Sequence, residues 1–584
     1  MRKDFLFKNS CRRFGRTEMY MKRFYLPALQ GAQNLLKRGM RNIIREPSSP
    51  YYGKILLDNG LFEPSSLFTY MECAVETYLS PDSIYYKKQE ILEFLRLLCI
   101  SAEESIHEDG TVDLIISNYH QPEYFNTPHL CYAYRLLRDL PEKTEEEEEI
   151  EKKLYHLVER IAEGLIASGF HTPNHRWVLT SSLYYAYNTL HKKDDRLLHR
   201  AKQFLAEKID IDENGEFSER SAGMYSAVTD RALCQIAMEA NMPELFEYVK
   251  RNLLLVSRFV EKGNMIFTQN SRRKDKGEVG SNVPFDFERY ADIALMGYVN
   301  TKDPVFLGIL KNILDSKTAT AILHLPFRFY ILYPELKHLS VNFAALPSAE
   351  KEFHLFHPDS GIVRVKKNDA VYSLLARNPD FLHITVGNIS IRARICSSFF
   401  AIAQFLPDTI EKIGEDQYRM TFHTWADYKL PFETPPEGSE NYWSMDYQSR
   451  TSISRCDFGY TVDFTFTENG IKIHMQTQGT EKVPFKFEMI APPDVYVRAG
   501  SAMTIATAGN FLCASEGDVT LSNADGDSLT VKNLFAKHFY HRNMRGSVPS
   551  PADKYLIFLT DFSPVDRTIE IICERNRPWD YFCN

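Results

Sequence analysis

A polar segment that leads into an apolar helix could bind and deprotonate an acidic substrate. In residues 169–190, a proline precedes Asn174, His175, Arg176 and Trp177, and apolar residues at helical spacing follow. The polar side chains therefore lie at the start of a helix, where unpaired N–H groups and the helix dipole favour an anion. In a simpler interpretation, Asn174 caps the helix and His175 is a hydrogen-bonded core residue.

A second segment of matching character follows at about the length of one helical hairpin. Residues 212–233 run from a turn through Glu219 and Arg220 to Tyr225, and then into another apolar helix. Tyr225 lies 50 residues after His175. An amide, an imidazole, a guanidinium and a phenol in one cavity could bind a uronic-acid carboxylate and move protons at the neighbouring carbon atoms.

The elements that must position these residues are predicted to be helices up to about residue 345 and strands after it. In the first part, apolar residues recur at spacings of three and four, as in Leu154–Ala167. In the second part, apolar and polar residues alternate between turn residues, as in residues 460–479. We therefore predict an α+β protein with a helical catalytic domain, residues 1–345, and an antiparallel β-sandwich domain, residues 346–584, joined near Leu346-Pro347-Ser348.

Polar, loop-like segments recur within the helical part. Asn118, Asn174, Tyr225 and Asn270 mark four of them, with gaps of 56, 51 and 45 residues. A ring of helical hairpins of that length would bring each polar segment to the same mouth of a central cavity. We therefore predict that the catalytic domain is an α/α toroid, an incomplete (α/α)6 barrel.

Other segments carry candidate substrate-binding residues. Asn118, His120 and Glu123 lie together before one predicted inner helix, and Arg272 and Arg273 lie in a loop where they could hold glycan carboxylates. In the strand-rich part, the candidates are His383 on a predicted strand and Trp443 in a long aromatic loop. In the alternative interpretation, these residues do not bind substrate. They cap a helix, lie in a solvent-exposed loop, or pack within a core or interface.

Composition and charge narrow the range of partners. The chain has 69 basic and 77 acidic residues and a net charge of −8, so no basic surplus exists to neutralise a nucleic acid. No apolar run is long enough to span a membrane, and none of the ten cysteines forms a CxxC pair. We expect no nucleic-acid or membrane partner, and a cytoplasmic protein (periplasmic if a signal peptide has been removed).

The Asn-His pair, followed about fifty residues later by Asp-Glu-Asn-Gly-Glu-Phe, Glu-Arg-Ser and Tyr-Ser, resembles the alginate lyase and heparinase II/III-like family. The resemblance implies an α/α toroid followed by a β-sandwich, and cleavage of uronic-acid glycans by β-elimination. It also implies that Asn174, with an arginine, binds the uronate carboxylate. His175 or Tyr225 would remove the C5 proton, and Tyr225 would protonate the departing C4 oxygen, with Arg220 as the guanidinium beside the phenol.

Many members of the family supply a histidine from the sandwich. His383 is the candidate here, although the usual His-x-His-x-Asp pattern is absent.

Two other functions remain open. The same scaffold could carry an exo-acting hydrolase such as a β-glucuronidase, for which Glu123, Glu219 and Asp230 are the candidate general acids. A non-catalytic glycan-binding protein is the third possibility. In each case the partner is an acidic oligosaccharide or polysaccharide, no metal or cofactor is expected, and a homo-oligomer remains open.

Overall fold

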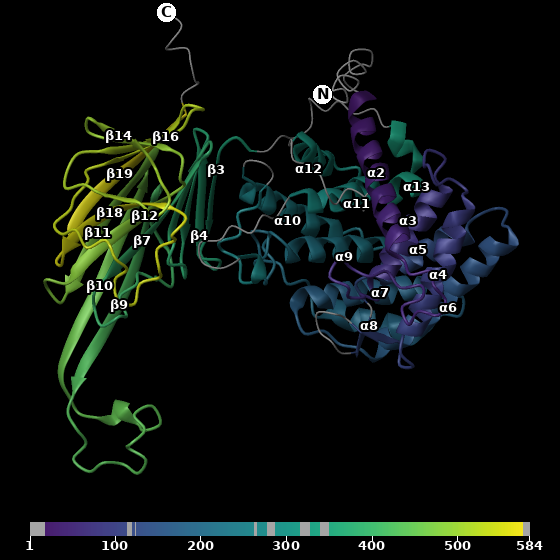
Figure 1. Ribbon diagram of the computed structural model, residues 1–584, viewed down its shortest axis with the longest axis horizontal. Coiled ribbons are helices and arrows are strands. Elements are labelled where there is room, and N and C mark those ends of the chain that lie inside the picture. The colour runs from purple at the N-terminus through teal and green to yellow at the C-terminus, as the bar shows by residue number, and fades with distance from the viewer. Residues whose placement is uncertain are drawn as a thin grey trace, which may run out of the picture. The chain divides into compact units, whose positions relative to one another are not determined.

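The chain divides into two compact units, one comprising residues 1–275 and 283–349 and the other residues 276–282 and 350–584. The first unit is helical and the second consists of strands, which confirms the predicted α+β class (Figure 1). The predicted junction at Leu346-Pro347-Ser348 lies outside the described residues. The computed structural model describes residues 18–113, 120–122, 124–261, 265–276, 287–315, 327–338 and 350–575.

The helical unit is a ring of helical hairpins, as predicted for an α/α toroid. Five inner helices pack side by side in chain order: α3 (Ser66–Leu79), α5 (Thr127–Arg138), α7 (Pro173–Thr189), α9 (Tyr225–Glu239) and α11 (Ala291–Thr301). Each is followed by an outer helix that packs against it: α4 (Gln89–Ser105), α6 (Glu145–Ala167), α8 (Asp195–Ala206), α10 (Leu245–Phe259) and α12 (Pro304–Asp315). Two further helices pack against α3: α2 (Glu18–Asn42) and α13 (Phe327–Leu332). Short 3-10 turns complete the unit: η2 (Lys274–Lys276), η3 (Phe287–Tyr290) and η4 (Pro334–His338).

Inner and outer helices differ in how much of their surface is buried. In α7, every residue from Trp177 to Ala186 is buried, and hydroxyl groups there bond to backbone carbonyls, as Ser182 does to Tyr124 at 2.5 Å. The outer helix α8 buries only three residues, Leu197, Ala201 and Phe204, which share one face. Hence the outer helices are amphipathic, whereas α7 carries small polar side chains that its neighbours must satisfy. No helix in the described part of the chain is long and apolar enough to cross a membrane.

A short turn recurs before several inner helices and positions the loops of the ring. Antiparallel bridges join residues six apart at Ile106↔Val112, Ile211↔Phe217 and Val260↔Ile266. Gly215 adopts φ 88° in the second of these turns, and a Cβ there would lie 2.6 Å from the Arg251 carbonyl oxygen of α10. The turn is therefore held against the outer helix, which positions the residues that lead into α9.

The second unit is a β-sandwich of two sheets whose strands pair antiparallel, except that β15 and β18 are parallel. One sheet has nine strands in the order β14 (Ala502–Ile505), β13 (Tyr496–Ala499), β16 (Val519–Ser522), β17 (Asp527–Lys532), β19 (Asp566–Arg575), β11 (Gly470–Gly479), β10 (Ser452–Phe466), β9 (Gln417–Lys429) and β8 (Glu411–Gly414). The other has eight strands in the order β15 (Phe511–Cys513), β18 (Tyr555–Phe562), β12 (Pro484–Ala491), β7 (Ile389–Ser397), β6 (Leu382–Val386), β5 (Ala370–Leu375), β4 (Ile362–Lys367) and β3 (Phe353–His357).

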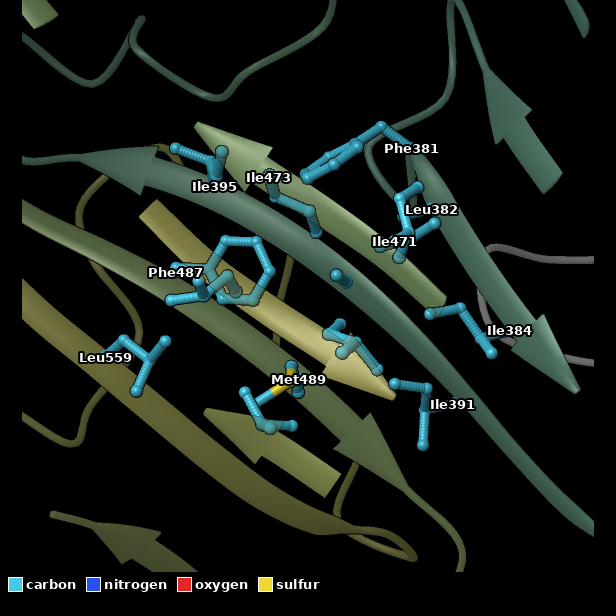
Figure 2. Packing of buried hydrophobic residues seen from close by; sticks show 14 of the residues in the cluster. Phe381, Leu382, Ile384, Ile391, Ile395, Ile471, Ile473, Phe487, Met489 and Leu559 are labelled. Atoms are coloured by element: carbon cyan, nitrogen blue, oxygen red, sulfur yellow. The ribbon is translucent and has the colours of Figure 1, made fainter. Parts of the chain in front are cut away.

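The core of the sandwich is formed by alternating residues from both sheets. Ile391 and Ile395 of β7 and Phe487 of β12 lie in one cluster with Ile471 and Ile473 of β11 (Figure 2). This period of two places the intervening residues of β7 and β12 on the other face of the sheet. The alternation seen in the sequence is therefore the direct cause of the sandwich.

Candidate active site

Asn174 presents a buried amide group at the start of α7. The Thr172 hydroxyl donates a hydrogen bond to Asn174 Oδ1 at 2.7 Å, which turns Nδ2 of the amide away from Thr172. Asn174 is only 1% exposed, and its Nδ2 has no hydrogen-bond partner among the described residues. A buried donor without a partner costs about 1–3 kcal/mol, so this position is suited to receive an acceptor from a ligand.

Glu219 and Arg273 lie beside Asn174. Arg273 Nε is 3.5 Å from Glu219 Oε1, and the backbone N–H of Asn174 faces the same carboxyl group. Burial raises the pKa of Glu219 to about 7, although Arg273 and the Asn174 N–H both act to lower it. Glu219 is therefore close to half protonated at neutral pH.

Tyr225 joins this group through the same arginine. The Arg273 guanidinium lies over the Tyr225 ring, 4.6 Å from its centroid, and the Tyr225 backbone N–H donates to Ser221 Oγ at 3.1 Å. Arg220, the guanidinium expected beside this phenol, pairs with Glu216 at 3.6 Å. Arg273, from the loop before α11, contacts the ring instead.

His175 follows Asn174 on the first turn of α7. Its Nδ1 is 2.7 Å from the Tyr124 hydroxyl, and its ring makes edge contacts with Phe125 and His171. Burial, together with the charges of His171 and Arg273, lowers the pKa of His175 to about 4. His175 is therefore neutral at neutral pH. We call Asn174, His175, Glu219, Tyr225 and Arg273 the Asn174 cluster.

Asp275 ties together the two loops that carry Tyr225 and Arg273. Its carboxylate accepts hydrogen bonds from the Gly223 N–H at 3.1 Å and from the Ser271 hydroxyl, and Ser221 also bonds to it. The side chain is completely buried. Because Ser221 also accepts from the Tyr225 N–H, Asp275 determines how Arg273 and Tyr225 meet.

We expect Asp275→Ala to lower the free energy of unfolding by about 1–3 kcal/mol, because the Gly223 N–H and two hydroxyl groups lose their acceptor. Urea unfolding followed by circular dichroism measures this difference. Asp275→Asn keeps one acceptor oxygen and should lose less. An unfolding midpoint for Asp275→Ala equal to that of the unchanged chain would contradict the assignment.

The other residues predicted in the helical unit are placed differently. Arg176 bonds to Glu207 at 2.8 Å and to Asp210 at 2.9 Å, and it lies over the Trp177 ring. The Trp177 side chain is fully buried, and its Nε1 donates to Asp210 at 2.7 Å, so its role in substrate binding stays a prediction. Both residues thus hold the segment after α8.

Arg272 is exposed beside Arg273. His120 lies in β2 (His120–Pro122), which pairs with β1 (Thr111–Asp113). Asn118 and Glu123 lie outside the described residues.

The two candidates in the strand-rich unit belong to different parts of the sandwich. His383 is buried on β6 opposite Arg392 of β7, in a region where Asp380 pairs with Arg392 at 3.1 Å and with Arg394. Burial lowers the pKa of His383 to about 4. Trp443 is 81% exposed in the loop between β9 and β10. Their roles in substrate binding remain predictions.

Several residues of the site were not found from the sequence. Tyr124 and His171 contact the His175 ring, Thr172 orients the Asn174 amide, and Asp275 bridges two loops. His171 and His175 are spaced four apart, a pattern that could have indicated a contact. Tyr124 and Asp275 carry no comparable signal, because the contacts that join them to the site, with His175 and Gly223, connect residues about fifty positions apart.

Comparison with known proteins is informative at the level of structure. No protein-family model and no curated protein sequence matches the chain. The structure is similar to that of a Paenibacillus xanthan lyase, with a TM-score of 0.58 and 9% identity, over 97% of this chain and 59% of that one. The chain thus spans less than two thirds of the xanthan lyase.

The chain matches a larger share of two further lyases. The Streptomyces coelicolor A3 chondroitin AC lyase, determined with chondroitin sulphate, has a TM-score of 0.52 and 10% identity over 96% of this chain and 80% of that one. The heparan sulfate lyase HepC from Pedobacter heparinus has a TM-score of 0.51 and 9% identity over 94% and 83%. The chain has the fold of the heparinase-like polysaccharide lyases. The resemblance drawn from the Asn-His and Glu-Arg-Ser segments is thereby confirmed for the polysaccharide lyase fold.

Proposed function

We propose that this chain is a lyase that cleaves uronic-acid-containing glycans by β-elimination, with the Asn174 cluster as its reacting groups. The observation that carries the proposal is the unpartnered, buried Nδ2 of Asn174 beside the guanidinium of Arg273 and the phenol of Tyr225. Donors of this kind suit a carboxylate whose adjacent carbon is to lose a proton. The polysaccharide lyase fold supports the same reaction class.

In the proposed first step, Asn174 Nδ2 and Arg273 bind the substrate carboxylate and stabilise the negative charge that develops when the C5 proton leaves. His175 is the base. It is neutral at neutral pH because burial lowers its pKa to about 4. In the tautomer whose Nδ1–H donates to the Tyr124 oxygen, Nε2 carries the lone pair that accepts the proton.

In the second step, the C4–O bond breaks and a C4–C5 double bond forms. Tyr225 donates its phenolic proton to the departing oxygen, and the Arg273 guanidinium over its ring stabilises the phenolate left behind. Exchange with solvent then returns a proton to Tyr225 and removes one from His175. Each atom and proton of the elimination is thus accounted for by two side chains.

A β-glucuronidase remains the second candidate because of Glu219. A buried carboxyl group with a pKa raised to about 7 has the property of a general acid in glycoside hydrolysis. Its buried neighbour Asp275 accepts hydrogen bonds from Gly223 and Ser271, which suits a structural role better than that of a second catalytic carboxylate.

The test is to incubate the chain with uronic-acid oligosaccharides and to follow the ultraviolet absorbance of a new C4–C5 double bond. We expect absorbance to rise in step with cleavage. Cleavage without absorbance that is also abolished in Glu219→Gln would establish the hydrolase instead. Binding without any cleavage, unchanged in Tyr225→Phe, would indicate a glycan-binding protein.

The pKa of Glu219 predicts how substrate affinity depends on pH. Above a pKa of about 7 the carboxylate repels the substrate carboxylate and competes for Arg273, whereas below it the neutral acid does neither. The protonated fraction falls from about nine tenths at pH 6 to about one tenth at pH 8, so we expect KM to rise about tenfold.

Steady-state kinetics across this range measures the effect, and Glu219→Gln, which cannot ionise, is the matched variant. Its KM should change little with pH. A variant that keeps the full pH dependence would show that another group titrates.

A further inference from the structure

Strands β9 and β10 form an arm that extends beyond the rest of the sandwich. Their paired register runs from Gln417↔Thr465 at the sandwich end to Lys429↔Ser452 at the far end. Near the sandwich, alternate residues of both strands are buried, whereas the first four residues of β10 are all exposed. Figure 1 shows the two strands continuing past their neighbours and ending in a loop, which includes η6 (Tyr447–Ser449).

A pocket of about 560 Å³ lies where this loop folds beside the strands. Four of its lining residues are aromatic: Trp425, Tyr428, Tyr442 and Tyr447. Three of these rings remain between 45% and 57% exposed. This exposed aromatic surface at the end of the arm contributes nothing to the sandwich core, and exposed apolar patches of this kind mark binding sites.

The rings are held in place by contacts within the arm. Tyr442 and Tyr447 stack with centroids 5.0 Å apart and planes 21° apart, and the Arg455 guanidinium lies 4.2 Å over Trp425. Rigid rings of this kind bind the C–H face of a pyranose, because the negative face of the ring attracts polarised C–H groups. Little conformational entropy is lost, since the rings are already ordered.

Polar groups in the pocket wall complement the rings. Asp427 Oδ1 and Arg450 Nε are buried without hydrogen-bond partners among the described residues, although Asp427 Oδ2 accepts from Ser452 at 2.9 Å. Lys429 Nζ lies 3.1 Å from the Gln448 carbonyl oxygen. The lining therefore contains an acceptor for sugar hydroxyls. Lys429 pairs with Asp427, the one carboxylate, at 3.9 Å, so Arg450 supplies the net positive charge of the lining.

We propose that this pocket is a second carbohydrate-binding site, separate from the Asn174 cluster, and that it holds a pyranose ring of an acidic glycan. The stacking on Trp425, Tyr442 and Tyr447 selects a sugar, and the excess of positive charge selects one that carries a carboxylate. The choice of an acidic glycan rests on the proposed function, whereas the choice of a sugar rests on the arm alone.

The test uses the full-length Tyr225→Phe variant labelled with 5-fluorotryptophan, so that a ligand is not cleaved during titration. The chain has four tryptophans, and Trp425→Phe assigns the Trp425 fluorine resonance. The probes are a hyaluronan hexasaccharide, which is acidic, and cellohexaose, which is neutral. We expect the acidic probe to shift the Trp425 resonance with an affinity at least tenfold higher than cellohexaose.

The double substitution Tyr442→Ala and Tyr447→Ala should weaken this binding about tenfold or more, because both rings are lost. Phe539→Ala is the matched control, since its ring is 68% exposed in the same unit but does not line the pocket. Its affinity should be unchanged. Circular dichroism checks that each variant is folded.

Three outcomes would overturn the proposal: no shift of the Trp425 resonance, an equal shift in the double variant, or dimerisation that the double variant abolishes. Equal affinity for cellohexaose would overturn its acidic specificity. Binding at Trp425 is measured without turnover, so it is independent of the double-bond assay. If no double bond forms but the arm binds the glycan, only the proposed lyase function is refuted.

Discussion

Tyr225→Phe is expected to lower kcat/KM on a uronic-acid oligosaccharide by about 10²–10⁴-fold, the range for loss of a general acid. The substitution removes only the hydroxyl group. The ring remains, and so does its contact with the Arg273 guanidinium, which lies 4.6 Å from the centroid. The backbone bond from Tyr225 to Ser221 is also unaffected. A large loss would therefore report the missing proton donor and not a disturbed loop.

Tyr248→Phe is the matched control for this experiment. Tyr248 lies on the outer helix α10, and an arginine, Arg251, also lies over its ring at 5.2 Å. The two substitutions thus remove the same atom from the same kind of ring contact. We expect Tyr248→Phe to retain activity within about twofold. Absorbance assays of both purified variants measure the difference, and a Tyr225→Phe variant with full activity would remove Tyr225 from the mechanism.

Asn174→Ala is expected to lower kcat by about 10²–10³-fold, as does the loss of a single preorganised donor to a developing oxyanion. The Nδ2 of Asn174 is buried and has no partner among the described residues, so its hydrogen bonds are available to the substrate without rearrangement. Once the donor is removed, the negative charge that forms on the carboxylate side of C5 depends on Arg273 alone.

A second variant distinguishes the role of the Asn174 amide from that of the Thr172 hydroxyl group that orients it. Thr172→Val deletes the hydroxyl that bonds to Asn174 Oδ1 at 2.7 Å, but it leaves the amide in place. We expect this variant to lose less than about tenfold in kcat, since the amide is less well oriented but still present. Equal losses in Asn174→Ala and Thr172→Val would indicate that the Thr172–Asn174 hydrogen bond acts only by holding the start of α7 and that the amide is not a donor to the substrate. Thermal unfolding of both variants shows whether either change affects stability.

Much of this site could be predicted from the residues alone. The Asn174-His175 pair and Tyr225 were identified because polar residues stand before apolar helical segments at hairpin spacing, and the structure brings them together with Glu219 and Arg273. Arg176 and Trp177, predicted as substrate-binding residues, bond to Asp210, and their role in binding stays a prediction. Their neighbours in sequence lie in the cluster, but successive residues of a helix point in different directions. Both therefore face Asp210 instead.

The sequence by itself determined the architecture, because hydrophobic periodicity is a local property. A period near 3.6 up to about residue 345 and a period of two after it were enough to predict a helical domain and a sandwich. The recurrence of polar segments at hairpin spacing predicted that the helices form a toroid. The recurrence of polar segments also placed the site at loops before inner helices.

Only the tertiary structure decided which side chains meet. Arg273 lies over Tyr225 because the Asp275 bridge joins the two loops that carry them. Tyr124 bonds to His175 from the loop before the neighbouring inner helix. Burial between these loops also raises the pKa of Glu219 to about 7. Such contacts join residues about fifty positions apart, and no local pattern encodes the distance between them.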